Sequence, residues 1–394
     1  MRLTRLDIDK SFIVKLDRSV REDGVNGIMT YGKKNDYPQV IESIVNNSVT
    51  GKSVTKIYSK FLTGQGFENE VINTTVIGRD NRGKKITARE LLSQIALSFG
   101  YHNGSYIHCN LTMEAKVKNV KLIPFKFCRF AKIDDKGYTA KIGVYDNWSK
   151  ENGMLQPKKI VWYNIFNLDA KIVAGQIKKA DSIEKYKGQV YFCFFDNSYL
   201  YPLAPLDPVY MDADTEYQLQ LFKNRSIRNG MMDKTVLRVE APSNEEERTE
   251  LKEGIKQFIG PDGDSLMVLE DEVDPATGEI KSTGAFKIDQ IKSNINSRLF
   301  ESWERDISNN IRKSMSAIPA ILIDYEESKL GTTSGEAIIQ ATNFYNAMTQ
   351  DDRSKISDMF KELFENSAIL GMAGNTNWKI KPLNLYDNGA TSDI

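Results

Sequence analysis

Residues Thr50-Gly-Lys-Ser53 have the ending of a phosphate-binding loop. Such a loop holds nucleotide phosphates with backbone amides, a lysine and a hydroxyl, and it needs another glycine five positions before the Gly-Lys pair. Asn46 stands at that position, and a helical apolar pattern, not a strand, precedes the segment. We therefore interpret it as a junction between two helices, with Ser48 or Thr50 near the cap, and expect no intrinsic ATP hydrolysis.

Histidines and cysteines are too few and too scattered to indicate a metal site. His102 and His108 are the only histidines, and Cys109 follows the second. Adjacent strand residues point to opposite faces, and the chain has no C-x-x-C or H-x3-H spacing. We interpret His102 as a polar loop residue and His108 as a half-buried strand residue. The odd number of cysteines, with Cys128 and Cys193 also among apolar neighbours, predicts reduced and buried thiols.

Charge is distributed unevenly, although the whole chain has 53 basic and 53 acidic residues. Glu114–Lys187 has 16 Lys/Arg and 8 Asp/Glu, whereas Glu240–Asp274 has 3 and 12. This asymmetry predicts separate surfaces for different partners, although two solvated faces of one domain would give the same pattern. The densest acidic turn is Glu270, Asp271, Glu272 and Asp274, and no second ligand set indicates calcium. No nucleophile stands beside a base, so we expect no enzyme, no metal and no cofactor.

The first half of the chain predicts an α+β region up to about Asp207. Asn35-Asp36 before Tyr37-Pro38 indicates a helix cap. Apolar residues at helical spacing follow in Val40–Val45 and Val54–Leu62, and a third helix is expected at Thr87–Phe99. Short aromatic or β-branched runs then predict strands at Tyr106–Leu111, Val117–Phe130, Tyr138–Tyr145, Ile160–Leu168 and Val190–Phe195. Three prolines, at positions 202, 205 and 208, form a stiff boundary.

Beyond the prolines, a helix at Thr215–Asn229 leads into a small α/β module at about 233–290, with strands expected at Thr235–Val239 and Leu266–Leu269. The next helix carries a stripe at a strict spacing of four: Leu299, Trp303, Ile307, Ile311 and Met315. Because 3.6 residues make one turn, this stripe winds around the helix and suits oblique packing against neighbours.

Ile318-Pro319 ends that helix, since the residue before proline avoids the α region. A polar loop follows, with no apolar group except Leu330 and the Tyr325 ring; its members are Tyr325, Glu326, Glu327, Ser328, Lys329, Leu330, Gly331, Thr332 and Thr333. From Glu336 to Leu370 there is no glycine or proline. We predict one helix there, about 50 Å long at 1.5 Å per residue.

This ordered series resembles the portal proteins of tailed bacteriophages. No single motif is specific, and the order of elements carries the resemblance. It implies a portal-like fold with these regions: a wing at 1–207, a first stem helix at 208–232, a clip at 233–291, a second stem helix at 292–317, a hinge and tunnel loop at 318–335, a long wing or crown helix at 336–370, and a short C-terminal segment at 371–394. Portals usually carry further crown helices, so the crown is expected to be short or absent.

The resemblance implies a ring of about twelve copies at one capsid vertex, through which double-stranded DNA is packaged and ejected. Residues Tyr325–Thr333 would face that DNA, and the 299–315 stripe would pack between subunits. The acidic turn at 270–274 would dock the terminase motor and the neck or adaptor protein. The major capsid protein would be a further partner, with assembly in the host bacterial cytoplasm and residence in the virion.

Two alternatives remain open at this stage. A different head–tail connector or structural scaffold would share the helices without needing a DNA channel. A nucleotide-dependent packaging enzyme would need the phosphate loop that Asn46 interrupts. The N-terminus lacks the apolar stretch of a signal peptide. No apolar run reaches the roughly 18 residues that span a bilayer, so we expect no membrane partner.

Overall fold

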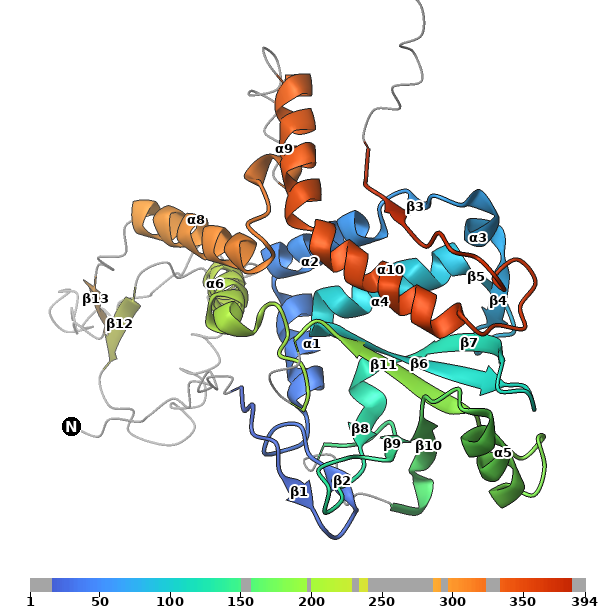
Figure 1. The fold of residues 1–394 in the computed structure, drawn as a ribbon. Coiled ribbons are helices and arrows are strands. Elements are labelled where there is room, and N and C mark those ends of the chain that lie inside the picture. Colours follow the sequence, from blue (N-terminus) through green and yellow to red (C-terminus); the bar gives the residue numbers. More distant parts are fainter. Residues whose placement is uncertain are drawn as a thin grey trace, which may run out of the picture. The chain divides into compact units, whose positions relative to one another are not determined.

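The computed structural model describes residues 16–149, 157–196, 200–228, 234–239, 286–291, 297–323 and 334–384 (Figure 1). The chain divides into two compact units. We call the first the body; it comprises residues up to Asp214 together with those from Ser308 onward. The second is the helical unit, Thr215–Ile307. Helices and sheets occur together in the body, which confirms the predicted α+β class.

A six-stranded mixed sheet forms the centre of the body, in the order β7-β6-β11-β10-β9-β8. Its strands are β6 (Gly104–Leu111), β7 (Val117–Ile123), β8 (Cys128–Phe130), β9 (Lys141–Val144), β10 (Val161–Ile165) and β11 (Gln189–Phe194). Only β10 and β11 pair in parallel, and α5 (Ala170–Lys179), which we did not predict, connects them. The strand expected at 117–130 is divided at Pro124, because proline has no amide hydrogen for the ladder.

Helices α1 (Tyr37–Asn47), α2 (Val49–Thr63) and α4 (Ala88–His102) confirm the three early helices. Figure 1 shows α2 and α4 layered over the sheet, together with α10. Our prediction that α4 ends before Gly100 was wrong. That glycine lies where α4 packs on α2, since an added Cβ would approach the Ser59 hydroxyl to 2.7 Å. The helix ends instead at Asn103, in the left-handed conformation with φ 56°.

The predicted cap of α1 was also wrong in its chemistry. Asp36 occupies the N-cap position, but its side chain makes no capping hydrogen bond. The Asn35 side-chain oxygen accepts from the Tyr31 amide at 2.9 Å and from Arg129 Nε at 2.6 Å. The Asn35 side chain is therefore bonded to a nearby amide and to a distant arginine, and it does not cap the helix.

The predicted long helix at 336–370 is two helices, α9 (Ser334–Met348) and α10 (Gln350–Phe364). They meet at an angle (Figure 1). The cause lies in Arg353, whose guanidinium donates to the Asn346 carbonyl at 2.6 Å and to the Thr349 hydroxyl at 2.7 Å. A straight helix would need that carbonyl for the amide four residues later. The buried arginine thus sets a bend that the absence of glycine and proline could not reveal.

The C-terminal part of the body is held by an aromatic cluster and a small sheet. β14 (Ile380–Lys381) pairs antiparallel with β3 (Gly66–Phe67). The Trp378 ring stacks on Phe364 of α10 with centroids 5.6 Å apart, and Phe67 meets Phe360 edge-on at 4.9 Å. These contacts place α10 and residues far along the chain against the end of α2.

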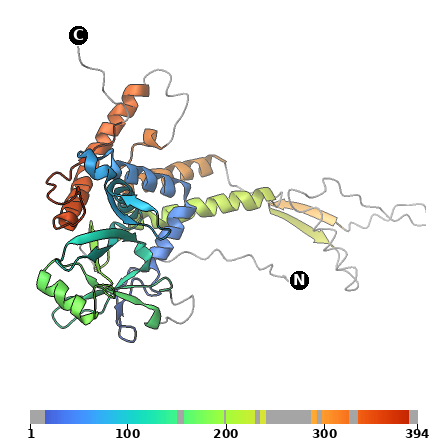
Figure 2. The ribbon, with the colours of Figure 1, turned by 90° about the vertical axis from the view of Figure 1, so that its right-hand side faces the viewer.

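The helical unit contains most of α6 (Tyr210–Arg228), the first part of α8 (Ser297–Ser314), and the strands β12 (Lys234–Val239) and β13 (Phe286–Ile291). β12 confirms the strand expected at 235–239, whereas β13, its antiparallel partner, was not predicted. Figure 2 shows these strands at the far end of α6. Lys223 of α6 forms an ion pair with Glu304 of α8. None of the described helices has the length and apolar character needed to cross a membrane.

Candidate functional site at the root of two long helices

Four aromatic rings stack on the chain that leads into α6. Tyr31 lies between Tyr37 and Tyr201, with ring centroids 4.4 Å from each and planes inclined by 16° and 9°. Phe130 of β8 continues the stack 5.3 Å from Tyr201. All four side chains are buried. The stack therefore fixes the segment before α6 to both α1 and the sheet.

Hydrogen bonds fix the last turn before α6 more specifically. The Tyr37 hydroxyl donates to Asp207 Oδ2 at 2.6 Å and accepts from the Ala204 amide at 3.0 Å. Asp207 Oδ1 accepts from Arg18 Nε at 2.7 Å. Burial raises the pKa of Tyr37 far above its usual value, so the hydroxyl keeps its proton for this bond. Asp207 is thus a buried carboxylate with two partners, placed just ahead of the helix.

Arg129 lies beside the stack, near the Tyr31 ring. It has no carboxylate partner among the described residues. Its guanidinium donates to the carbonyls of Asn35 at 2.9 Å and Cys128 at 2.7 Å. It also lies 5.8 Å from the Tyr31 ring centroid and 5.7 Å from that of Trp148. Burial lowers the pKa of Arg129, but carbonyl oxygens and ring faces stabilise its charge.

The end of α8 is held in the same body. The Tyr345 hydroxyl of α9 donates to the Met315 carbonyl at 2.8 Å. Ser316 and Ala317 then both adopt the left-handed conformation, with φ 56° and 54°. Each such residue costs about 1–2 kcal/mol when it is not glycine, so surrounding contacts must hold this turn. Ile318, whose amide donates to the Arg312 carbonyl at 3.2 Å, closes the helix.

Both helix ends open onto one groove of about 460 Å³. Pro205, Asp207 and Pro208 line it from the start of α6, and Ser314, Met315 and Ser316 line it from the end of α8. Tyr58 and Asp352 also line it, and the tyrosine hydroxyl donates to the carboxylate at 2.7 Å. We call this place the helix root. The groups that line the helix root hold the ends of two helices, and they do not form a catalytic arrangement.

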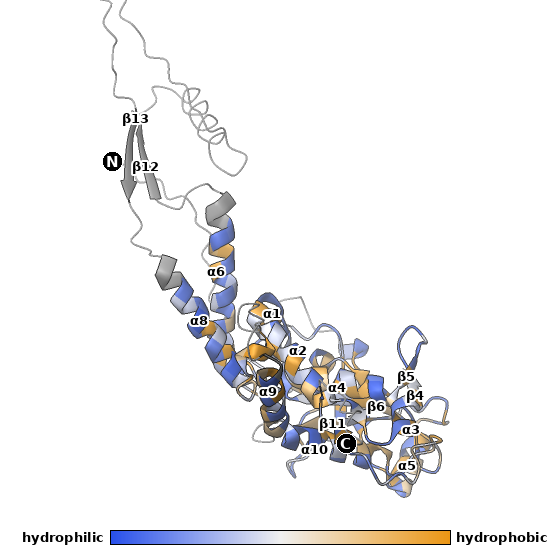
Figure 3. Cartoon of the chain, turned by 90° about the horizontal axis from the view of Figure 1, so that it is seen from above, coloured by the Kyte–Doolittle hydropathy of each residue, from blue (hydrophilic) through white to orange (hydrophobic). Residues whose placement is uncertain are grey.

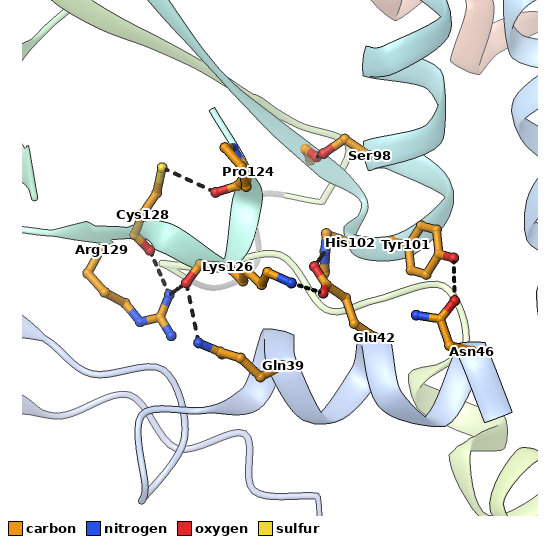
Figure 4. Close-up of polar contacts among 11 residues, drawn as sticks. Gln39, Glu42, Asn46, Ser98, Tyr101, His102, Pro124, Lys126, Cys128 and Arg129 are labelled. Carbon is orange, nitrogen blue, oxygen red and sulfur yellow. Dashed lines mark hydrogen bonds and ion pairs between the residues drawn. The ribbon is translucent and has the colours of Figure 1, made fainter. Parts of the chain in front are cut away.

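A second polar cluster lies at the C-terminal end of α4 (Figure 4). His102 is buried, stacks on Phe125 at 4.5 Å, and places Nε2 3.3 Å from Glu42 Oε1. The other Glu42 oxygen accepts from Lys126 Nζ at 2.6 Å. Burial lowers the pKa of His102, which favours the neutral ring. Our interpretation of His102 as a loop residue was therefore wrong: it ends a helix and packs in the core.

This cluster lacks the partners of a catalytic site. The Ser98 hydroxyl donates to the Gly104 carbonyl at 2.6 Å and so faces no base. Burial raises the pKa of the Cys109 and Cys128 thiols, and that of Cys193 to about 12. The described ranges hold no group of three or more residues able to bind a metal.

The segment Thr50–Ser53 lies inside α2, as the junction interpretation requires. Ser48 is the N-cap, and its hydroxyl accepts from the Gly51 amide at 2.8 Å. The amide that a phosphate would need is already bonded. A phosphate loop is therefore excluded at this position.

The predicted packing stripe on α8 is divided by the structure. Ile307, Ile311 and Met315 are buried in the single chain. Packing of the stripe between subunits stays a prediction. Trp303 keeps 46% of its surface exposed. The side chain of Leu299 is outside the described set, as are the whole acidic turn and loop: Glu270, Asp271, Glu272 and Asp274, and Tyr325, Glu326, Glu327, Ser328, Lys329, Leu330, Gly331, Thr332 and Thr333.

Sequence reasoning missed the residues that form the helix root. Two Tyr-Pro pairs, at 37–38 and 201–202, were interpreted as a helix start and a boundary. Their rings in fact meet on either side of Tyr31. Arg129 stands between Cys128 and Phe130 in an apolar strand, and a lone arginine in such a run was the available signal of a buried charge.

Comparisons with known proteins bear on the fold. A chain from the virion of a native gene transfer agent particle is 10% identical, with a TM-score of 0.51 over 87% of this chain and 83% of that one. A chain from the neck of an empty gene transfer agent particle, computed with C6 symmetry, is also 10% identical, with a TM-score of 0.51 over 90% and 85%. The chain shares the fold of these particle components.

A phage portal protein of the HK97 family from Corynebacterium diphtheriae is 9% identical over 77% of this chain and 86% of that one, with a TM-score of 0.35, too low to support an argument. No protein-family model matches the sequence, and no curated protein matches it.

Replacing Asp207 by alanine tests the helix root. The change leaves the Tyr37 hydroxyl and the Arg18 guanidinium without their shared acceptor. We expect the free energy of unfolding to fall by about 2–3 kcal/mol, the range for losing a charged, buried hydrogen-bond partner. Hydrogen exchange should quicken first at the amides of residues 207–214. Glu184→Ala, at an exposed position, is the control; equal effects of the two changes would contradict an anchoring role.

Proposed function

We propose that this chain is a phage portal protein, copies of which form a ring at one capsid vertex through which double-stranded DNA is packaged and ejected. The observation that carries the proposal is the helix root, where α6 begins and α8 ends on one groove of the same body. Such a root suits a pair of helices that act together as a stem. The order of elements in the sequence and the fold shared with gene transfer agent components support the same conclusion.

A ring explains the distribution of exposed apolar groups. Ile339, Phe344 and Met348 on α9 are largely exposed, as is Trp303 on α8. Single exposed apolar residues are ordinary, but three on one helix suit contacts between identical copies. About twelve copies is the number that the portal resemblance implies. It is compatible with the C6 symmetry used for the neck particle.

DNA passage requires a channel whose lining binds the duplex only weakly. We assign the channel-facing role to the loop 324–335, in which Lys329 stands beside Glu326 and Glu327. One cation per subunit amid two carboxylates gives few phosphate contacts, and tight binding needs many. Gly331 would let the loop bend as the duplex moves, whereas Gly335 lies in the first turn of α9.

The acidic stretch Glu240–Asp274 is our candidate docking surface for the terminase motor and later for the neck or adaptor protein. Twelve carboxylates against three basic residues favour a basic partner and an association that salt weakens. A connector or scaffold without a channel is the second candidate, since it would share the helices. A packaging ATPase is disfavoured because Ser48 occupies the Gly51 amide.

Trp303→Asp tests the subunit interface. Trp303 is 46% exposed in one chain while Ile307 is 7% exposed, so a charge at 303 disturbs assembly more than folding. We expect light scattering to show a loss of rings, and the unfolding of the body to stay near wild type. Ser302→Asp, at the exposed preceding residue of α8, is the control. A wild-type protein that stays a folded monomer, both at high concentration and within particles, would contradict the ring proposal.

A photo-crosslinker at position 329 tests the loop. In DNA-filled particles it should label DNA, because the loop is assigned to the channel. Lys329→Glu should alter retention or translocation of DNA with only a modest effect on ring formation. If the crosslinker labels only capsid protein or neighbouring subunits, the loop does not line the channel.

Simultaneous replacement of Glu270, Asp271 and Glu272 by lysine tests the docking surface. Binding of the packaging motor, measured with purified rings at low salt, should weaken while the rings remain intact. The matched change Glu245→Lys, Glu246→Lys and Glu247→Lys reverses the same charge elsewhere in the acidic stretch. Motor and adaptor binding that is unchanged by the first set would move the interface to another part of the chain.

A further inference from the structure

A basic groove lies where the β4–β5 hairpin crosses the edge strand of the sheet. The hairpin consists of β4 (Val76–Arg79) and β5 (Lys85–Thr87), and it lies beside β7 in Figure 1. The groove measures about 460 Å³, and its polar lining residues are Arg79, His108, Asn110, Lys118, Asn119 and Lys121. The remaining lining residues are apolar or glycine, so no carboxylate lines the groove.

Backbone packing gives this groove a fixed shape. Gly78 of β4 sits directly on β7, where an added Cβ would lie 2.1 Å from the Val120 carbonyl oxygen. Only glycine allows that approach. The hairpin is therefore held against the sheet edge with Arg79 on β4 and Lys118 and Lys121 on β7.

The three groove cations have no carboxylate partner among the described residues. Arg79 donates to the Gly83 carbonyl at 3.1 Å, and Lys121 donates to the Asn81 side chain. Nearby acids are already paired with other cations: Asp80 with Arg82 at 3.0 Å, Glu90 with Lys84 at 2.8 Å and Glu114 with Lys116 at 2.8 Å. A positive field therefore remains over the groove, in a chain whose total charge is zero.

Amide side chains lie beside the charges, together with an imidazole whose Nε2 is already bonded. The Asn110 side chain donates to Asn119 Oδ1 at 2.7 Å, which orients both amides within the groove. His108 Nε2 lies 2.6 Å from the Lys187 carbonyl, so the ring donates there. Cations with neighbouring amide donors form the kind of surface that positions a phosphate backbone without reading bases.

We propose that this groove binds the phosphodiester backbone of double-stranded DNA outside the channel. The proposal rests on the proposed function, which makes DNA the polyanion present and repeats the groove around a ring. Each subunit alone would bind weakly, and repetition would raise the total affinity without gripping DNA in the channel. The groove also lies within the basic region Glu114–Lys187 and its neighbouring hairpin, a charge excess that the portal assignment left unexplained.

The test is fluorescence anisotropy of the full-length protein with a labelled 30-base-pair duplex of arbitrary sequence, across a range of salt concentrations. The combined change Arg79→Gln, Lys118→Gln and Lys121→Gln should weaken binding at low salt by about tenfold or more. Because each lost phosphate contact lowers the slope of log affinity against log salt by about 0.9, the slope should fall by about 3.

A matched control removes the same charge elsewhere: Lys52→Gln, Lys56→Gln and Lys60→Gln, all exposed on α2. It should bind duplex like wild type. Equal losses in the two variants, or no binding by wild type, would overturn the groove proposal. Selective binding of a peptide of residues 240–274 in place of duplex would also overturn it, in favour of an acidic protein segment. Ring formation, imaged separately for each variant, tests the portal assignment independently, since the groove could fail while rings persist.

Discussion

Two long, polar helices must be held by their ends. Most of α6 and α8 is hydrophilic (Figure 3), and residues 301–306 of α8 are all exposed. α6 shows little apolar periodicity, and the described part of α8 buries apolar side chains only from Ile307 onward. The helix root supplies the missing stabilisation: Asp207 and the tyrosine stack fix the start of α6, and Tyr345 fixes the end of α8. The rest of the body, including the bend at Arg353 that directs α9, arranges these anchors.

Much of this fold follows from local sequence patterns. Apolar residues at helical spacing predicted α1 and α2, and alternating β-branched runs predicted most of the sheet, because short-range periodicity reports which face is buried. α5 was missed although Ile172, Val173 and Ile177 give it an apolar face, because the helix is short and buries only Val173. β13 was not predicted from its own residues, although its partner β12 was.

The site was harder to predict than the fold. Asn35, Arg129 and Asp207 act through partners that are distant in the chain, and no spacing rule connects them. The stripe on α8 shows a different limit. Its regularity predicted burial, and Ile311 is buried in the single chain, but a pattern does not name the partner that covers each residue. The two charged surfaces stay a prediction; Lys118 and Lys121 of the basic region line the groove beside Gly78.

The central claim is that copies of this chain close into a ring around an axial hole wide enough for a DNA duplex. Electron cryomicroscopy of the purified protein, and of particles that contain it, measures this directly. The account predicts a closed ring of about twelve copies with α6 and α8 arranged around an open axis. A monomer, an open filament, or a ring whose axis is filled by protein would contradict it.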